Sequence, residues 1–357
     1  MKIGVASADY LLPKNSANGQ EQWGGAGWAR IGQYVPYLRE AGHEVTVGTL
    51  WKSPECLLVS DGYTEERVAP DIVIIQRLMH EGIDESTRVG QRAGQVVIHD
   101  VDDWYWGLDP RNTAWKATHP KHNPNENTAF YSKNVASADL VIASTPYIAE
   151  LLRDKFGVDT VVLKNMVDTN KFAVVDQPDT PTIGWVGSTA HRSGDLEILA
   201  GIFPQFLRNG SIKLLHAGHY DGAPKFADAL RVDESMIETT PLRPSSEYQK
   251  MLTMNVGLVP LNDIPFNHAK SDIKGLEYAS AGIPFIASPL SAYAELYEDW
   301  HTGFILAKRP RDWVKAINKM LDISLRNEYQ QALLELVKQR DISHGAKALV
   351  DLLESLV

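Results

Sequence analysis

The 357-residue sequence is poor in several features that define whole classes of protein. It holds one cysteine, Cys56, so a disulfide framework and a metal site built from several cysteines are excluded. Its longest apolar runs, such as residues 72–75, are far too short to span a bilayer. Asp9 ends the apolar start of the chain before it reaches the length of a signal peptide. These absences lead us to expect a cytoplasmic protein without an integral membrane segment.

A basic excess is missing as well. The formal net charge is −10, and both halves of the chain are acidic. This composition argues against a platform for nonspecific binding of nucleic acid, although it permits a local basic groove. Hydrophobic residues make up 44% of the chain and charged residues 22%, as in an ordinary globular protein that buries a large core. The length suggests two domains.

Short β-branched runs alternate with helical patterns along most of the chain. The expected strands are 2–7, 44–50, 71–76, 95–99, 139–144, 160–163, 182–187, 212–217, 237–242, 256–261 and 284–288. The expected helices include 28–38, 83–93, 125–135, 146–156, 196–207, 311–321, 325–340 and 346–356. A linker rich in proline and polar residues follows Phe172. We therefore predict an α/β fold of two doubly wound domains, with the ligand site in the cleft at the carboxyl ends of their strands.

Small-residue turns follow the first expected strand of each half. Gly24 and Gly25 open a helix, where backbone N–H groups can approach an anion closely; a flexible turn is the alternative. In the second half, Ser188 and Arg192 lie in a turn between a strand and a helix. Arg192 is either a partner for a phosphate or an ordinary solvated arginine.

Acidic residues gather where the strand at 95–99 ends. Asp100, Asp102 and Asp103 follow His99 directly or closely. Such carboxylates can chelate a divalent cation, cap a loop or accept hydrogen bonds from ligand hydroxyls, and we expect no metal. The tryptophans of the loop 104–133 that comes next are Trp104, Trp106 and Trp115. This loop either stacks against an acceptor molecule or packs its own aromatic side chains.

The densest candidate is a helix that begins near residue 270. Lys270, Lys274 and Glu277 are spaced i, i+4, i+7 and therefore share one helix face. Lys270 and Ser271 fall at the helix start, where N–H donors point outward. Cations at that place suit a diphosphate and the glutamate suits a diol, whereas the alternative is a solvated face with a Lys–Glu pair.

Several motifs follow one another along the chain: Gly24-Gly25 with 41–47, Asn165-Met166-Val167-Asp168, 184–187, and Leu276-Glu277-Tyr278-Ala279 with Gly282-Ile283-Pro284. Together they resemble the retaining glycosyltransferases of the GT-B fold, closest to glycosyltransferase family 4. The resemblance implies a Rossmann-like acceptor domain at 1–172, a Rossmann-like nucleotide-sugar domain at 173–340, and a helix at 341–357 that crosses back to the first domain. It also implies transfer of a sugar from a UDP- or GDP-sugar with retention of configuration, and we expect the cations to make a metal unnecessary.

The resemblance also implies roles for the candidate residues. The donor diphosphate would contact Gly24, Gly25, Arg192, Lys270, Ser271 and Lys274. The nucleoside would contact Ser188, Arg243 and Glu277, and the donor sugar would contact Asn267 and His268. His99 and Asp100 would act catalytically near the reacting carbon of the sugar. The acceptor side would include Asp102, Asp103, Trp104, Trp106 and Trp115.

Three positions depart from the family pattern. The family usually has a glutamate for the donor sugar at the position of Ala269. It usually has an arginine at the position of Ser188 and a lysine at the position of Ser193. The lost glutamate is the main argument for an alternative, a non-catalytic nucleotide-sugar-binding protein; a nucleotide-sugar epimerase of the same fold is another. The acceptor stays open between a glycan, a lipid, a protein, a small metabolite and a modified nucleic-acid base. We expect a monomer or a homodimer.

Overall fold

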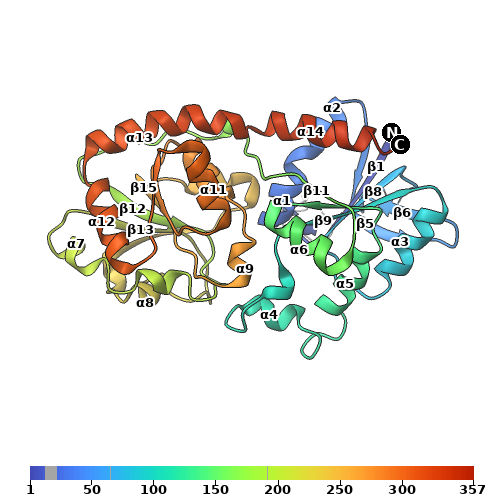
Figure 1. Ribbon diagram of the computed structural model, residues 1–357, viewed down its shortest axis with the longest axis horizontal. Helices are drawn as coiled ribbons and strands as arrows, with labels where there is room; N and C mark the ends of the chain where they lie inside the picture. Colours follow the sequence, from blue (N-terminus) through green and yellow to red (C-terminus); the bar gives the residue numbers. More distant parts are fainter. Residues whose placement is uncertain (13–21, 65, 191) are drawn as a thin grey trace.

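The computed structural model describes residues 1–12, 22–64, 66–190 and 192–357. Within these ranges, two sheets of six parallel strands form two lobes (Figure 1). The first sheet contains, in spatial order, β11 (Thr160–Val162), β10 (Leu140–Ala143), β9 (Val96–Val101), β8 (Ile72–Gln76), β1 (Lys2–Ser7) and β4 (Glu44–Val47). The second contains β14 (Ile237–Pro241), β13 (Lys213–His219), β12 (Thr182–Val186), β15 (Val256–Val259), β16 (Phe285–Ala287) and β17 (Phe304–Leu306).

Each sheet reverses its winding direction at one internal position. In the first sheet the reversal lies between β1 and β8, and in the second it lies between β12 and β15. Crossover connections leave these two neighbouring strands in opposite directions, which opens a crevice at their carboxyl ends. The predicted doubly wound α/β architecture is confirmed, and it marks one ligand-binding edge on each lobe.

Helices cover both faces of each sheet (Figure 1). Those of the first lobe are α1 (Gly25–Arg30), α2 (Val35–Glu40), α3 (Ile83–Arg92), α4 (Thr113–Thr118), α5 (Thr128–Ala136) and α6 (Pro146–Phe156). Next come α7 (Pro204–Arg208), α8 (Phe226–Leu230), α9 (Pro265–His268), α10 (Ile273–Ser280), α11 (Ser291–Trp300), α12 (Pro310–Met320), α13 (Ile323–Leu336) and α14 (Ile342–Glu354). Small antiparallel pairings join β2 (Tyr10–Leu11) to β3 (Gln22–Trp23), and β5 (Thr49–Lys52) to β6 (Leu57–Ser60) and β7 (Arg67–Val68).

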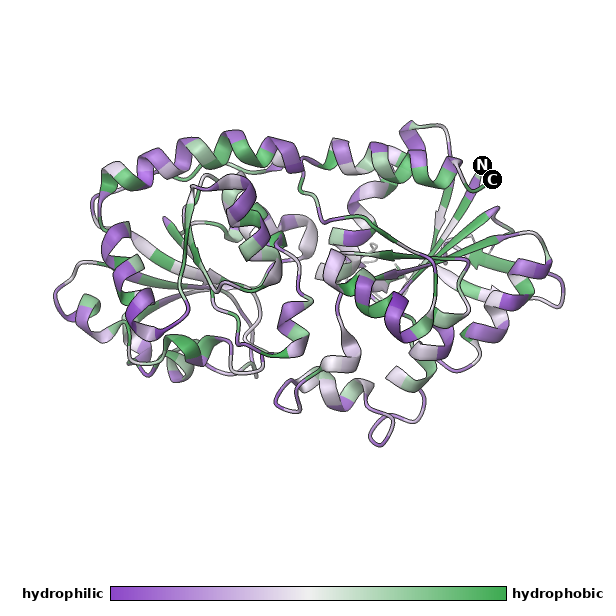
Figure 2. Cartoon of the chain, in the orientation of Figure 1, coloured by the Kyte–Doolittle hydropathy of each residue, from purple (hydrophilic) through white to green (hydrophobic). Residues whose placement is uncertain are grey.

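The strands supply the apolar cores of both lobes. In β8, the side chains from Ile72 to Ile75 are fully buried, because α2 and α14 pack on one face of the sheet and β6 packs on the other. Figure 2 shows the same pattern throughout, with hydrophobic strands inside and helices that are hydrophilic on their outer faces. Burial at about 25 cal/mol per Å² of apolar surface makes these two cores the main source of stability.

Prolines explain where two expected helices break. The pattern at 28–38 forms α1, a short 3₁₀ turn at Gly32–Tyr34 and then α2, in which Pro36 occupies the first turn. The pattern at 196–207 forms a 3₁₀ turn at Leu196–Leu199 followed by α7, which begins at Pro204. Proline has no N–H to donate to the preceding turn, so it starts a new helix and does not continue the old one.

The chain ends by crossing from the second lobe to the first. Helix α13 lies along the second lobe and α14 continues it over the first (Figure 1). The buried face of α14, formed by Ile342, Ala346, Leu349 and Leu353, belongs to the same apolar cluster as Ile3 of β1. Helix α14 therefore belongs to the core of the first lobe.

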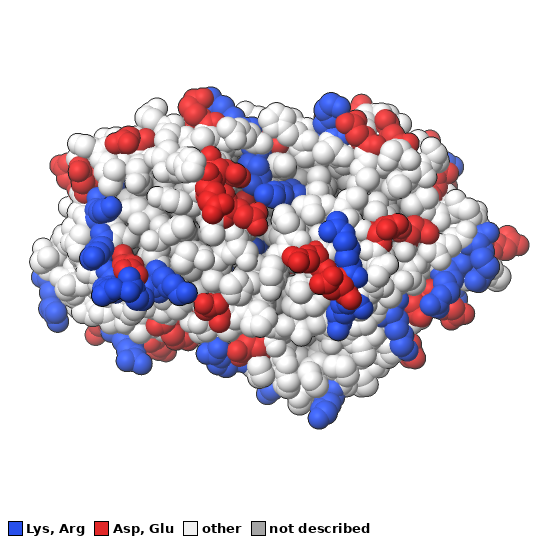
Figure 3. All heavy atoms as spheres, in the orientation of Figure 1, with Lys and Arg blue, Asp and Glu red and all other residues white. Residues whose placement is uncertain are grey.

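In the view of Figure 3, both acidic and basic side chains occur on the surface of each lobe. Among the helices in the described ranges, none is both long and apolar enough to cross a bilayer.

Candidate active site

A cleft between the two lobes contains two adjoining cavities. The first has a volume of about 370 Å³ and the second about 600 Å³. Both are lined by Gly25, Ala26, Asp103, Arg192 and Lys270, so they are continuous with each other. We call them the first and the second cavity.

The first cavity lies at the reversal points of both sheets. Gly25 opens the helix that follows β1, Gly187 directly follows β12, and Leu261 lies just beyond β15. This is the crevice that doubly wound sheets use for ligands. A Cβ on Gly25 would meet open space, so the backbone of this turn is accessible from the cavity. Gly24 does not line either cavity; its N–H donates to the Asp9 carbonyl over 2.7 Å.

Helix α10 supplies two titratable groups of the first cavity, Lys274 and Glu277. The Lys274 Nζ donates to the Val186 carbonyl over 2.7 Å and to the Tyr248 hydroxyl over 3.1 Å. That hydroxyl in turn hydrogen-bonds the Glu277 carboxylate. Burial lowers the pKa of Lys274 to about 8 and raises the pKa of Glu277 to about 7, while the opposite charge of each acts against both shifts. The helical spacing therefore does bring these two side chains into one cavity wall.

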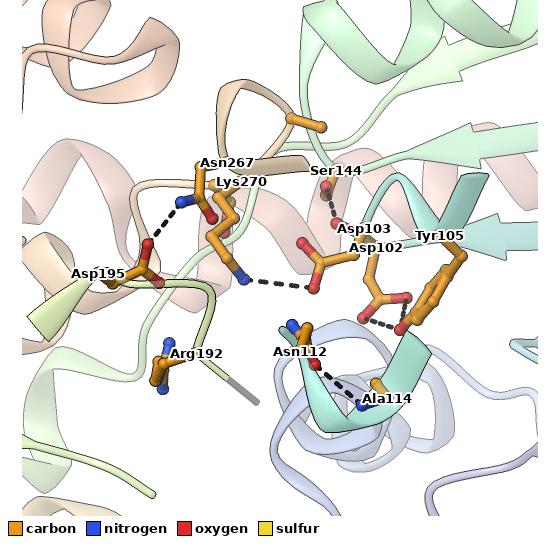
Figure 4. A network of polar contacts seen from close by, with 12 residues as sticks. Asp102, Asp103, Tyr105, Asn112, Ala114, Ser144, Arg192, Asp195, Asn267 and Lys270 are labelled. Carbon is orange, nitrogen blue, oxygen red and sulfur yellow. Dashed lines mark hydrogen bonds and ion pairs between the residues drawn. The ribbon is translucent and has the colours of Figure 1, made fainter. Parts of the chain in front are cut away.

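Two more cations face the cleft. The Arg192 guanidinium lies 5.0 Å from the Trp185 ring and its Nε donates to the Ser188 carbonyl over 3.2 Å. Within the described part of the chain, Arg192 has no carboxylate partner. The Lys270 Nζ lies 3.6 Å from an oxygen of Asp103 on the opposite lobe (Figure 4). His191, in the turn of Arg192, lies outside the described residues, as do residues 13–21 of the loop after β1.

The strand end that we expected to act on the sugar is arranged differently. His99 is fully buried within β9, both of its ring nitrogens lack a partner among the described residues, and burial lowers its pKa to about 3. Asp100 is 1% exposed and holds the Arg30 guanidinium at 2.7 Å. Neither side chain lines a cavity. The correction has a simple cause: β9 is an interior strand, and its side chains are enclosed until the strand ends.

Of the acidic residues at this strand end, Asp102 and Asp103 do reach the cleft. Asp102 lines the first cavity, and its oxygens lie 3.3 Å from the Tyr105 hydroxyl. Burial, with Asp103 beside it, raises the pKa of Asp102 to about 7. Asp103 lines both cavities and faces Lys270 across the cleft (Figure 4).

The tryptophans expected on the acceptor side pack within their own segment. Trp106 stacks on Tyr131 with ring centroids 5.1 Å apart and donates its Nε1–H to Ser132 over 2.8 Å. Trp104 packs on Trp106, and Trp115 packs on two histidines, at 119 and 122. None of the three lines the second cavity, whose wall on this side is formed by Leu108, Asn112, Ala114, Ala117 and Thr118. The self-packing interpretation of the loop therefore describes its tryptophans.

Four further candidates lie away from the first cavity. Asn267 is 2% exposed and donates to Asp195 over 2.6 Å (Figure 4). His268 contacts Asp263 over 2.7 Å, and Arg243 is exposed and pairs with a glutamate of its own turn. Ser188 lines only the second cavity. None of Asn267, His268, Arg243 and Ser188 therefore lines the first cavity, and their expected contacts with the donor stay predictions.

Among the residues that line the first cavity, Arg30, Asn165 and Tyr248 are polar groups without an expected role from sequence. Asn165 belongs to the motif before the interlobe connection, which is a signal for its importance. Arg30 and Tyr248 carry no local signal, because each acquires its partner from a distant segment. Among the described residues, no three His, Cys, Asp or Glu side chains are grouped to hold a metal ion.

Comparison with known proteins agrees with this geometry. Residues 180–322 match the family model described as glycosyl transferases group 1. Over 121 residues, the chain is 22% identical to TuaH of Bacillus subtilis, named as a teichuronic acid biosynthesis glycosyltransferase. That match covers 34% of this chain and 30% of the relative's length.

Solved structures resemble the whole chain in fold. Sucrose-phosphate synthase from Thermosynechococcus elongatus has a TM-score of 0.66 at 14% identity, covering 99% of this chain and 98% of that one. Anabaena HepE in complex with UDP has a TM-score of 0.64 at 15% identity, covering 99% and 100%. Residues 180–322 are thus a glycosyl transferase group 1 domain, and they form most of the second lobe of a GT-B fold.

Proposed function

We propose that this chain is a glycosyltransferase that moves a sugar from a nucleoside diphosphate sugar to an acceptor. The observation that carries the proposal is the convergence of Arg192, Lys270, Lys274 and Glu277 on one cavity at the reversal points of both sheets. Lys270 just before α10 and Lys274 in its first turn suit the diphosphate, and the Glu277 carboxylate further along α10 suits the ribose diol. Donor binding belongs to the lobe of residues 173–340, and acceptor binding to that of 1–172.

The positively charged side chains of the first cavity can stabilise the diphosphate as it leaves. As the bond between sugar and diphosphate breaks, negative charge develops on the phosphate oxygens. Arg192, Lys270 and Lys274 are already in place to stabilise that charge, so no rearrangement of solvent is required. We expect a chelator to leave the rate of turnover unchanged, and a loss of turnover that magnesium or manganese restores would contradict this part of the proposal.

The second cavity is the place we assign to the acceptor. It adjoins the first at Asp103, and its wall combines hydrogen-bonding groups with apolar ones, as a polyhydroxyl acceptor requires. We propose retention of configuration through a front-face route, in which an oxygen of the leaving diphosphate takes the proton of the attacking hydroxyl. The membership in family 4, the cytoplasmic location and the monomeric or dimeric state stay predictions.

A binding screen followed by a turnover assay tests the proposal. UDP is the first nucleotide to try, since the Anabaena relative was solved with it, and GDP is the second. The bound nucleotide should raise the melting temperature, because a ligand of the native state stabilises it by mass action. Substituting Lys270 by methionine should weaken nucleotide binding about tenfold, since a charge-assisted hydrogen bond is lost. Lys319→Met, on the exposed face of α12, is the matched control.

Three outcomes of the turnover assay separate the functions. Release of nucleotide from a nucleotide sugar, with the sugar on an acceptor, supports transfer. Interconversion of the sugar without nucleotide release supports an epimerase. Binding without turnover of any donor supports a non-catalytic binding protein, and absence of nucleotide binding overturns the proposal.

A further inference from the structure

A line of polar contacts crosses from the first lobe to the second along the wall of the first cavity. In the first lobe, the Arg30 guanidinium is held by Asp100 and is 1% exposed. Its Nη1 donates to Oδ1 of Asn165 over 2.8 Å. The Nδ2 of Asn165 donates to the Ser271 hydroxyl oxygen over 2.7 Å. Arg30, Asn165 and Ser271 all line the first cavity, so a ligand there lies against the whole line.

The chemistry of the partners decides the direction of each hydrogen bond. A guanidinium only donates, so the side-chain oxygen of Asn165 must face Arg30 and its NH₂ must face Ser271. The Ser271 oxygen therefore accepts a hydrogen bond and keeps its own O–H hydrogen for another partner. Within the described residues, the hydroxyl makes one hydrogen bond, the one that it accepts from Asn165. The hydroxyl is thus left to donate into the cavity that it lines.

A second set of contacts keeps Asn165 and the start of α10 in place. The Arg340 Nη2 donates to the backbone carbonyl of Asn165 over 2.7 Å. The same guanidinium binds both oxygens of Asp272, over 2.8 and 3.0 Å. Because Asp272 directly follows Ser271 and precedes α10, Arg340 ties the asparagine to the helix start that holds the serine. Asn165 therefore faces Ser271 in one fixed arrangement.

We infer that Asn165 is a positioning residue that turns the Ser271 hydroxyl into a donor for a phosphate oxygen of the nucleotide. The inference rests on the proposed function, since it needs a diphosphate in the first cavity. It assigns Asp100 a new part as well: its carboxylate balances the charge of Arg30 and so orients the asparagine. The donor site then depends on a residue of the first lobe, and correct approach of the two lobes becomes a condition for tight binding of nucleotide.

A double-mutant cycle between Asn165 and Ser271 tests the inference. In Asn165→Asp the new carboxylate accepts hydrogen bonds from both neighbours, so the Ser271 hydrogen turns away from the cavity. We expect UDP, or GDP if that is the nucleotide bound by the unmodified chain, to bind about tenfold more weakly. In the Ser271→Ala background the hydroxyl is absent, so the same substitution should weaken binding only through repulsion between the new charge and the diphosphate, and the loss should be clearly smaller than tenfold. Repulsion between the new charge and the diphosphate is present in both backgrounds and cancels in the cycle.

The controls separate this role from a structural one. Asn170→Asp makes the same exchange at an exposed position nearby and should leave affinity unchanged. Melting temperatures of all variants show whether they fold; if Asn165→Asp does not, Asn165→Ala replaces it in the same cycle. Equal losses of affinity with and without Ser271 overturn the inference and leave the proposed function standing. An unmodified chain that binds neither UDP nor GDP overturns both.

Discussion

Glu277 and Lys274 make the nucleotide site sensitive to pH at the scale of single residues. Burial raises the pKa of Glu277 to about 7, and only the ionised carboxylate is a strong acceptor for the ribose hydroxyls. Affinity for nucleotide should therefore rise as pH increases through that value, from pH 6 to 7.5. Glu277→Gln should abolish this rise and weaken binding at pH 7.5 about tenfold, measured by titration calorimetry across the range.

Glu277→Gln should also change how nucleotide affinity depends on pH in the alkaline range. The charge of Glu277 holds the pKa of Lys274 up against burial, so its removal lets that pKa fall further. Affinity in the variant should then decline at lower pH than in the unmodified chain, as the ammonium loses its proton. Glu335→Gln, on the exposed side of α13, is the control. A wild-type affinity that is flat between pH 6 and 7.5 would contradict the assignment of Glu277.

Asp100 is expected to matter for stability more than for chemistry. Asp100→Asn leaves the Arg30 guanidinium buried without its counter-charge, and breaking such a pair costs about 3–5 kcal/mol of unfolding free energy. Urea denaturation measures this loss directly. Unchanged stability combined with abolished turnover would instead restore a catalytic part for Asp100.

At the scale of elements, variants in the segment from Trp104 to α5 distinguish side chains that stabilise the fold from side chains that line the second cavity. Trp106→Ala removes a ring stacked on Tyr131 and packed on Phe156, so it should lower the free energy of unfolding by about 3–5 kcal/mol. The ratio of sugar transfer to donor hydrolysis should stay at the wild-type value, since the ring does not reach the second cavity. Both rates and the melting temperature are measured on one preparation.

Helix α4 provides the complementary variant. Ala117 lines the second cavity, so Ala117→Leu should raise the KM for acceptor while nucleotide affinity is unchanged. Lys116→Leu, one position earlier and outside the cavity wall, should leave the KM at its normal value. If Trp106→Ala alters the transfer ratio and Ala117→Leu does not, the acceptor site lies elsewhere.

At the scale of the whole molecule, the two lobes are linked because α14, at the end of the chain, packs into the core of the first lobe. Leu349 of α14 is 2% exposed in the core of the first lobe, so Leu349→Ala should cost about 2–5 kcal/mol. The weakened region should be the first lobe. Hydrogen exchange should therefore show faster opening in α2, which packs against α14, than in α12 of the second lobe. Faster opening confined to the second lobe would show that α14 does not stabilise the first.

Local features of the sequence determined much of this protein. The β-branched runs that recur between helical patterns were enough to predict the strands of both sheets except β17 (Phe304–Leu306). The shared face of Lys274 and Glu277 also follows from sequence, because helical spacing is a local property. Lys270 and Ser271 line the first cavity as well, but the expectation that they begin the helix was wrong, because they lie in the turn between α9 and α10, whose N-cap is Asp272.

Only the tertiary structure decided which side chains meet. Asp100 finds Arg30 70 residues away, and Asn165 finds Ser271 106 residues away. His99 and Asp103 are neighbours in sequence, yet one is enclosed by strands on both sides and the other reaches the cleft. Periodicity specifies the face on which a side chain lies, whereas its burial and partners depend on what packs against that face. Those contacts arise from segments distant in the chain, and no local pattern records them.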